Sequence, residues 1–185
     1  LHAAQIQGFF EIPVDHLYSL PVLIKHLKEH YVKDINNLVV VSPDIGGVKT
    51  AKSYANILGT ELAIVAKQRI SATEVDAHAL IGNVDGKDVL LVDDMTESGG
   101  TLCAAAKILK AHGAARIFAG VSHAVLNEKS RERICNSPLE CLLTSDSVPM
   151  ASGCDRVDTV SIAPLFAKAI LNIHKNASVT HLFEI

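Results

Sequence analysis

The chain has 185 residues, of which 49% are hydrophobic, 20% charged and only 4% aromatic, so it is globular, with room for one ordinary domain and a short appendage. The formal charge of -3, with no run of like charges, argues against nucleic acid or an anionic membrane as a partner. No apolar run approaches the ~20 residues that a membrane-spanning helix needs.

The cysteines bear on the cellular compartment of the protein, and the first residues bear on whether the chain is a fragment. Cys103, Cys135, Cys141 and Cys154 show no CxxC pair and no metal-ligand spacing, so we expect reduced packing residues in a cytoplasmic protein. The chain opens on Leu1 with neither an initiator Met nor a signal peptide. We therefore expect a processed product or a fragment.

The first third of the chain predicts a connector, a strand and a helix. Residues 1–20 fit no regular period and are expected to be a connector from a missing amino-terminal domain, which leaves 21–185 as the folded domain. The β-branched run at 38–42 predicts a buried strand of the kind found in parallel sheets covered on both faces. Helical spacing follows over 48–58, and Gly59 suits the helix stop.

The middle of the chain holds the clearest strand. A strand is first expected at 61–66, and the polar stretch 67–79 predicts a mobile loop. A short strand or hairpin is expected at 79–85, with Asp85-Gly86 as its turn. Residues 88–93 are apolar between two acids and predict a fully buried strand.

The remaining elements continue an alternation of helix and strand. In chain order they are a helix at 101–112, a strand at 115–122, a helix at 127–135, a strand at 139–144 and a helix at 162–174. This alternation predicts an α/β fold with a doubly wound, mostly parallel sheet. Ligands of such sheets bind where the carboxyl ends of strands meet the starts of helices, and three loops at that edge carry polar residues.

The first of these loops follows the clearest strand. Asp93 and Asp94 can bind sugar hydroxyls or a ligand-bound Mg²⁺, and Gly99 and Gly100 let the backbone approach a ligand. The free N–H groups of the helix that begins at Thr101 form an anion site. An ordinary turn with Thr101 as N-cap is the alternative. Two adjacent acids followed by Gly-Gly-Thr favour ligand binding instead.

The other two loops are weaker taken alone. Residues 42–48 place Asp44, Gly46 and Gly47 before a helix, which suits pyrophosphate and a metal ion but fits a plain turn equally well; the spacing is not that of a P-loop. Lys67 and Arg69 form a basic pair that alone would be a solvated surface feature. Their position beside two phosphate-type loops favours contact with a phosphoryl group. His123 is interpreted as structural.

Four segments together resemble one enzyme family. Residues 93–101 are similar to the ribose 5-phosphate loop shared by type I phosphoribosyltransferases and phosphoribosyl pyrophosphate synthetases. Residues 1–10 resemble the synthetase stretch that carries a metal-binding histidine, 41–47 the pyrophosphate loop and 67–69 the catalytic flexible loop. The ending 178–183 also resembles the family's terminus. The resemblance implies a sheet of the type I phosphoribosyltransferase kind, with 21–185 as the catalytic domain and the helix at 162–174 packing back on the missing half.

The resemblance also implies a reaction and a role for each motif. The family transfers the pyrophosphoryl group of ATP to the anomeric hydroxyl of ribose 5-phosphate, gives phosphoribosyl pyrophosphate and AMP, uses Mg²⁺ and forms homo-oligomers, with a hexamer expected for the full-length protein. Lys67 and Arg69 would be catalytic, His2 and Asp44 would hold the metal, and Asp44, Gly46 and Gly47 would form the pyrophosphate loop. The substrate-binding residues would be Asp93, Asp94, Thr96, Glu97, Ser98, Gly99, Gly100 and Thr101.

The chain departs from the family pattern in three ways. Glu97-Ser98 stands where Asp-Thr is usual, Gln68 replaces a basic residue, and the amino-terminal half, which supplies much of the family's adenine site, is missing. We therefore expect the chain to be inactive alone. A phosphoribosyltransferase and a non-catalytic regulatory protein associated with the synthetases remain as alternatives. Retention of His2 together with 67–69 argues against both.

Overall fold

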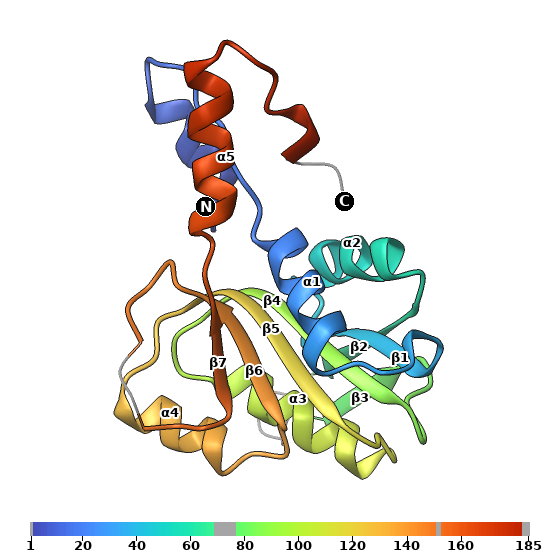
Figure 1. Ribbon diagram of the computed structural model, residues 1–185. Coiled ribbons are helices and arrows are strands. Elements are labelled where there is room, and N and C mark those ends of the chain that lie inside the picture. The colour runs from blue at the N-terminus through green and yellow to red at the C-terminus, as the bar shows by residue number, and fades with distance from the viewer. Residues whose placement is uncertain (1, 69–76, 151–152, 183–185) are drawn as a thin grey trace.

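The computed structural model describes residues 2–68, 77–150 and 153–182. These residues form one sheet in the order β3-β2-β1-β4-β5-β6-β7, parallel except for β3, which pairs antiparallel with β2 (Figure 1). The strands are β1 (Leu38–Ser42), β2 (Glu61–Gln68), β3 (Ala77–Ile81), β4 (Asp88–Thr96), β5 (Ile117–Ala124), β6 (Cys141–Ser145) and β7 (Val157–Val160).

Helices cover both faces of the sheet. They are α1 (Leu20–His30), α2 (Val48–Leu58), α3 (Gly100–Ala111), α4 (Glu128–Cys135) and α5 (Ala163–His174), with 3-10 turns at Ala4–Phe9, Ile35–Asn37 and Thr180–Leu182. Figure 1 shows α1 and α2 on one face and α3 and α4 on the other. None of the helices within the described ranges is long and apolar enough to cross a membrane.

Side-chain alternation along the strands divides the core into two layers. In β1, Leu38 and Val40 pack with the α1 and α2 side chains, while Val39 and Val41 pack with the α3 and α4 side chains. All five β1 residues are buried, because a parallel strand covered on both faces has no solvent face. This explains the continuous apolar run of the strand.

The predicted sheet is confirmed, and four details differ. The strand expected at 79–85 is β3, which begins at Ala77, and β2 continues to Gln68, so the expected loop is shorter at both ends. Residues 69–76 of that loop lie outside the described part of the chain. Helix α1 and strand β7 were not predicted. Strand β4 continues to Thr96, so that Asp93 and Asp94 lie within the strand and not after it.

The expectation of four reduced cysteines is wrong for two of them. Cys135, at the end of α4, and Cys154, shortly before β7, form a disulfide across a sequence separation of 19. Cys103 and Cys141 are free and buried, as expected of packing residues, and burial raises the pKa of both thiols. The pairing was invisible in the sequence because it depends on how α4 and the segment before β7 fold back on each other.

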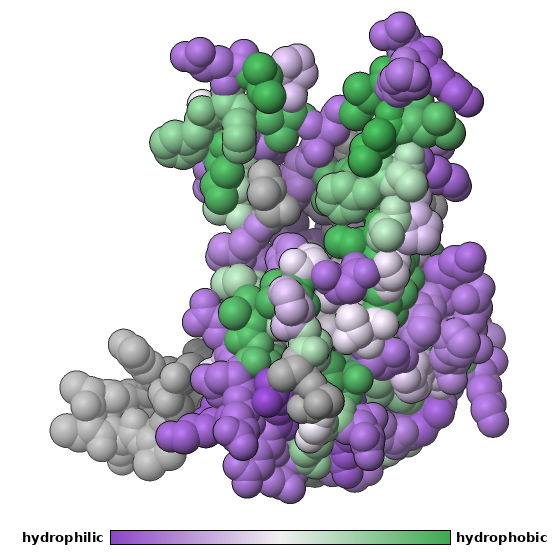
Figure 2. Space-filling model, turned by 60° about the vertical axis from the view of Figure 1, so that its left-hand side comes forward, coloured by the Kyte–Doolittle hydropathy of each residue, from purple (hydrophilic) through white to green (hydrophobic). Residues whose placement is uncertain are grey.

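Helix α5 stands apart from the sheet (Figure 1). Only Ala169 of this helix is buried, whereas Phe166, Ile170, Leu171 and Ile173 expose between 48% and 65% of their surface. The segment near the amino end likewise exposes Phe9, Phe10 and Ile12. Figure 2 shows hydrophobic surface on the two projections at the top of the molecule. Large exposed apolar side chains are thus concentrated on α5 and on residues 9–12.

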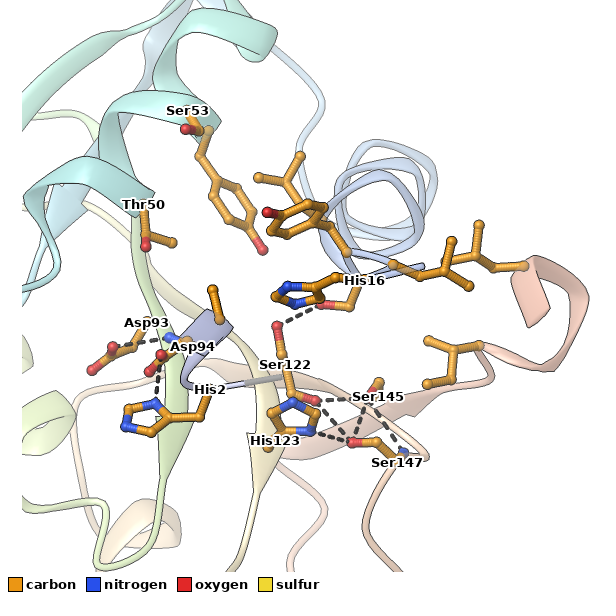
Figure 3. A pocket seen from close by; sticks show the side chains of 18 of the residues that line it. His2, His16, Thr50, Ser53, Asp93, Asp94, Ser122, His123, Ser145 and Ser147 are labelled. Atoms are coloured by element: carbon orange, nitrogen blue, oxygen red, sulfur yellow. Dashed lines mark hydrogen bonds and ion pairs between the residues drawn. The ribbon is translucent and has the colours of Figure 1, made fainter. Parts of the chain in front are cut away.

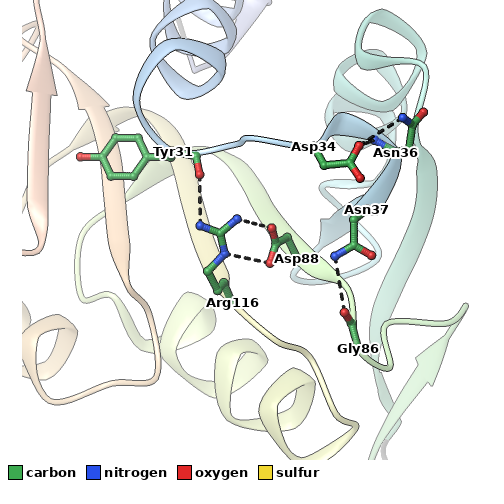
Figure 4. A network of polar contacts seen from close by, with 7 residues as sticks. All are labelled: Tyr31, Asp34, Asn36, Asn37, Gly86, Asp88 and Arg116. Carbon is green, nitrogen blue, oxygen red and sulfur yellow. Dashed lines mark hydrogen bonds and ion pairs between the residues drawn. The ribbon is translucent and has the colours of Figure 1, made fainter.

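A polar network ties α1 to the amino ends of β4 and β5, at the edge away from Asp93 (Figure 4). The Arg116 guanidinium forms a two-pronged ion pair with Asp88, with Nε donating to Oδ1 at 3.0 Å and Nη2 to the other carboxylate oxygen. Nη1 donates to the Tyr31 carbonyl oxygen at 3.3 Å. The Asp88 side chain is only 8% exposed, so its charge depends on this partner.

We expect Arg116→Met to lower the free energy of unfolding by about 3 kcal/mol, because the mutation leaves a buried carboxylate without its cation. Urea denaturation measures the change. The double mutant Arg116→Met, Asp88→Asn is the control, since removing both charges restores much of the loss. A loss below about 1 kcal/mol, the range of exposed ion pairs, would contradict this role.

Candidate functional site

A cavity of about 750 Å³ lies at the carboxyl ends of the parallel strands (Figure 3). Its volume suits a ligand of nucleotide size. The walls come from the ends of β4, β5 and β6, the first half of α2, residues 16–20, the amino-terminal segment and the start of α5. The polar side chains in the wall are His2, His16, Tyr18, Ser19, Lys49, Thr50, Ser53, Tyr54, Asp93, Asp94, Ser122, His123, Ser145 and Ser147.

Acidic side chains gather at one side of the cavity. Asp93 Oδ1 accepts a hydrogen bond from the Asp94 N–H at 2.9 Å, and Asp94 Oδ2 lies 2.6 Å from His2 Nδ1. Burial raises the pKa of Asp93 to about 6; the neighbouring carboxylates of Asp94 and Asp44 add to the rise, and the Asp94 N–H opposes it. Among the described residues, no Lys or Arg forms an ion pair with these three acids. Such a cluster suits a ligand that brings hydroxyl donors or a cation.

The loop after β4 turns into α3 through a glycine in the left-handed conformation. Gly99 has φ 66°, which favours glycine, and a Cβ there would meet the Ile134 side chain at 3.1 Å, so the packing leaves little room for a side chain. Gly99 is the N-cap of α3, which corrects the alternative that Thr101 is the cap. The Gly100 N–H reaches Ser98 Oγ at 3.2 Å. Glu97, Ser98 and Thr101 are exposed, as a loop that receives a ligand from solvent requires.

The loop after β1 is organised by one carboxylate. Asp44 Oδ1 accepts from the Gly47 N–H at 2.9 Å, and Ser42 Oγ donates to the Asp44 carbonyl at 2.6 Å. A Cβ at Gly47 would meet Ser42 Oγ at 2.9 Å, and one at Gly46 would meet Asp44 Oδ1 at 3.3 Å. Neither glycine has a positive φ, and the room for a Cβ is small at Gly47 and limited at Gly46. The turn leads directly into α2.

The predicted catalytic pair is only partly within the described structure. The Lys67 backbone lies in β2 opposite His78 of β3, one residue before the strand ends, and therefore at the same sheet edge as Asp44 and Asp93. Arg69 lies outside the described residues. Thus Asp44, Asp93 and the Lys67 backbone share the edge that the strand pattern predicted, and the structure also brings His2 to Asp94.

A group of hydroxyls on the far side of the cavity was missed. His123 was interpreted as structural, yet it lines the cavity half-buried, with Nδ1 2.7 Å from Ser147 Oγ (Figure 3). Ser145 donates to the Ser122 carbonyl at 2.6 Å, and Ser19 Oγ lies 2.6 Å from Ser122 Oγ. The available signal was the polar residues that end β5 and β6, next to the strand that carries Asp93.

The donors fit Mg²⁺ only as a substrate-borne ion. In the described part of the chain, no group of three or more His, Cys, Asp or Glu side chains could enclose a metal ion. Mg²⁺ normally keeps several waters and is held by one or two carboxylates together with substrate phosphates. The carboxylates of Asp44, Asp93 and Asp94 are of that kind, and no all-protein cage is needed.

Comparisons with known proteins identify the family of this chain. A family profile described as "Phosphoribosyl transferase domain" matches residues 14–153. The ribose-phosphate pyrophosphokinase of Chlorobaculum tepidum is 48% identical over 185 residues, and that of Cereibacter sphaeroides is 44% identical over 187. The chain is covered completely in both cases but spans only 57% and 56% of those proteins.

Solved structures show the same pattern. The phosphoribosylpyrophosphate synthetase from Mycobacterium smegmatis matches 96% of this chain and 57% of its own chain, with a TM-score of 0.85 and 33% identity. An adenine phosphoribosyltransferase matches 68% of the chain with a TM-score of 0.53 and 20% identity, and at that identity the match shows a shared fold only.

Proposed function

The chain belongs to the phosphoribosyl transferase domain family and is homologous to ribose-phosphate pyrophosphokinases, and on that premise we propose that it is the catalytic part of such an enzyme. The proposed reaction is transfer of the pyrophosphoryl group of ATP to the anomeric hydroxyl of ribose 5-phosphate, with AMP as the other product. The observation that carries the proposal is the 2.6 Å contact between His2 and Asp94. Residues 1–10 resemble the synthetases but not the phosphoribosyltransferases. The contact joins this segment to β4, the strand that leads into the ribose-phosphate loop.

Each part of the site has a task in this reaction. The first N–H groups of α3 and the hydroxyls of Ser98 and Thr101 bind the 5-phosphate, and Asp93 accepts hydrogen bonds from ribose hydroxyls. The 42–47 turn binds the pyrophosphoryl group at the start of α2. Phosphoryl transfer needs alignment and charge stabilisation more than covalent help from the protein. Lys67 and Arg69 supply positive charge to the oxygens that gain negative charge.

Mg²⁺ is proposed to arrive with ATP. When bound, it would neutralise charge on the phosphate oxygens, with Asp44 and His2 as the protein groups that hold it. The raised pKa of Asp93 fits this arrangement, because a bound cation or a sugar hydroxyl would favour the ionised carboxylate that burial disfavours. A site rich in acids and charged phosphates requires such a cation.

The apolar faces of α5 and of residues 9–12 support a further part of the proposal. We propose that they pack on an amino-terminal half and on other subunits of a homo-oligomer, a hexamer in the full-length protein. The relatives are long enough to contain such a half, since the chain spans 57% of the Chlorobaculum tepidum enzyme. Exposed Phe166 and Phe9 are the kind of residue that such a contact buries.

The proposed reaction predicts AMP formation that depends on ribose 5-phosphate. The assay combines ATP, Mg²⁺ and ribose 5-phosphate with a version of the protein that includes an amino-terminal half, and omission of ribose 5-phosphate is the control. A phosphoribosyltransferase would instead release pyrophosphate from phosphoribosyl pyrophosphate in the presence of a nucleobase. A regulatory protein would do neither, and either outcome would replace the proposal.

A further inference from the structure

Helix α4 contacts the ribose-phosphate loop through an arginine that no motif included. Arg133 Nη1 donates to the Ser98 carbonyl oxygen at 2.8 Å, and the same nitrogen would lie 3.4 Å from a Cβ at Gly100. The guanidinium thus sits against the turn from β4 into α3 while the side chain remains exposed. A guanidinium has five N–H donors, and this contact uses one of them.

The rest of α4 is built to hold this arginine in place. Ile134 packs against Gly99, close enough that a Cβ on the glycine would touch it. Beyond the helix, Arg156 Nη1 donates to the carbonyls of Ser137 at 2.7 Å and Leu139 at 2.8 Å. The disulfide between Cys135 and Cys154 fixes the carboxyl end of α4 to the segment before β7. Arg133 therefore projects from a helix that is braced at its end.

The positive charge of Arg133 lies near the amino end of α3, where the helix dipole disfavours a cation. The amino end of α3, at Gly100, carries the positive end of the helix dipole, which repels a cation and attracts an anion. In the described structure no carboxylate forms an ion pair with Arg133. A bound phosphate at the loop would offset both positive charges.

We infer that Arg133 is a positioning residue for the ribose-phosphate loop. By holding the Ser98 carbonyl it keeps the 97–101 backbone in the conformation in which its N–H groups converge on the 5-phosphate. The conformational entropy of the loop is then lost when the protein folds and not when the ligand binds, which favours binding. The inference rests on the proposed function and deepens it, since it assigns a residue to the binding of the phosphate end of the sugar.

The test compares three variants in the purified protein. Arg133→Met removes the donor and keeps much of the apolar stem, and Arg133→Lys keeps a charged donor. Arg131→Met is the matched control, because Arg131 lies on the same helix and donates to the Leu126 carbonyl, away from the loop. Calorimetric titration with ribose 5-phosphate and with inorganic phosphate gives the affinities, and thermal melts give the stability. Steady-state kinetics of the same variants in a version extended by an amino-terminal half give KM and kcat.

We expect Arg133→Met to weaken ribose 5-phosphate binding and raise its KM about tenfold or more, as loss of a charged hydrogen bond does, while kcat changes much less. Arg133→Lys should recover most of the affinity, and Arg131→Met should bind as the unmodified protein does. Unchanged binding in Arg133→Met would overturn the inference. Equal losses of binding and melting temperature in Arg133→Met and Arg131→Met would also overturn it, by showing a role in α4 stability alone. If the unmodified protein bound no ribose 5-phosphate, the proposed function itself would fail.

Discussion

Lys67→Ala should lower the turnover of the complete enzyme by roughly 10²-fold or more, as removal of one preorganised electrostatic group does in other enzymes. The Lys67 backbone lies near the end of β2, at the sheet edge that also carries Asp44 and Asp93. In the proposed reaction, Lys67 supplies positive charge to oxygens that gain negative charge as the pyrophosphoryl group moves. The KM values of both substrates should change much less, because this charge develops during transfer and not on binding.

Steady-state AMP release measures the effect, with Lys25→Ala as the control. Lys25 lies on α1 with a side chain that is 76% exposed, and its ion pair with Glu29 spans one helical turn, so its removal should leave turnover unchanged. Near-normal turnover in Lys67→Ala would show that this lysine has no role in catalysis. A rise in KM with unchanged kcat would make it a binding residue instead.

The parallel part of the fold was predictable because its signals are local. Strands β1 and β4 are buried on both faces, so their sequences are continuous apolar runs, and Gly59 adopts the left-handed conformation expected of a helix stop. Helix α1 was missed although Leu23, Ile24 and Leu27 form its buried stripe. Ser19 at the N-cap and Pro21 in the first turn mark its start, but these signals were not used, and no Gly marks its end.

Edge strand β7 was missed for a different reason. It has only four residues, and its side chains are partly exposed, so neither a continuous apolar run nor a strict alternation marks it. Its position depends on pairing with β6, where Leu142 lies opposite Val157. Such pairing is a tertiary property. The disulfide between Cys135 and Cys154 belongs to the same class, because only the folded chain brings α4 near the approach to β7.

In the candidate site, too, the local features were predictable and the contacts between distant parts of the sequence were not. Asp93, Asp94 and the Gly99-Gly100 turn were predictable because one strand and one loop carry them in sequence. The residues of the His2–Asp94 contact are 92 positions apart in the sequence, and those of the Arg133–Ser98 contact are 35 apart. Neither contact could therefore be predicted from a short-range spacing. The resemblance supplied His2, whereas nothing in the pattern of α4 distinguished Arg133 from a solvated helix residue.

Residues 1–185 alone should not make phosphoribosyl pyrophosphate at a useful rate. The cavity offers carboxylates, hydroxyls and the His16–Tyr18 ring stack, but the sequence provided no clamp for adenine, and the synthetases to which the chain is similar are much longer than it is. We propose that the adenine site is completed by an amino-terminal half and a neighbouring subunit. Without it, ATP would lose most of the binding that orients its β-phosphorus.

The expected loss is large because in-line attack tolerates little misplacement: a shift of about 1 Å can cost ~10²-fold in rate. A sensitive AMP-release assay with the 185-residue chain, ATP, Mg²⁺ and ribose 5-phosphate measures it, against a version extended by an amino-terminal half. Binding of ribose 5-phosphate to the short chain is the internal control, since the 97–101 loop and its support by α4 lie within these residues. Turnover within about tenfold of the longer protein, a difference of only ~1.4 kcal/mol in barrier, would show that the ATP site lies inside residues 1–185.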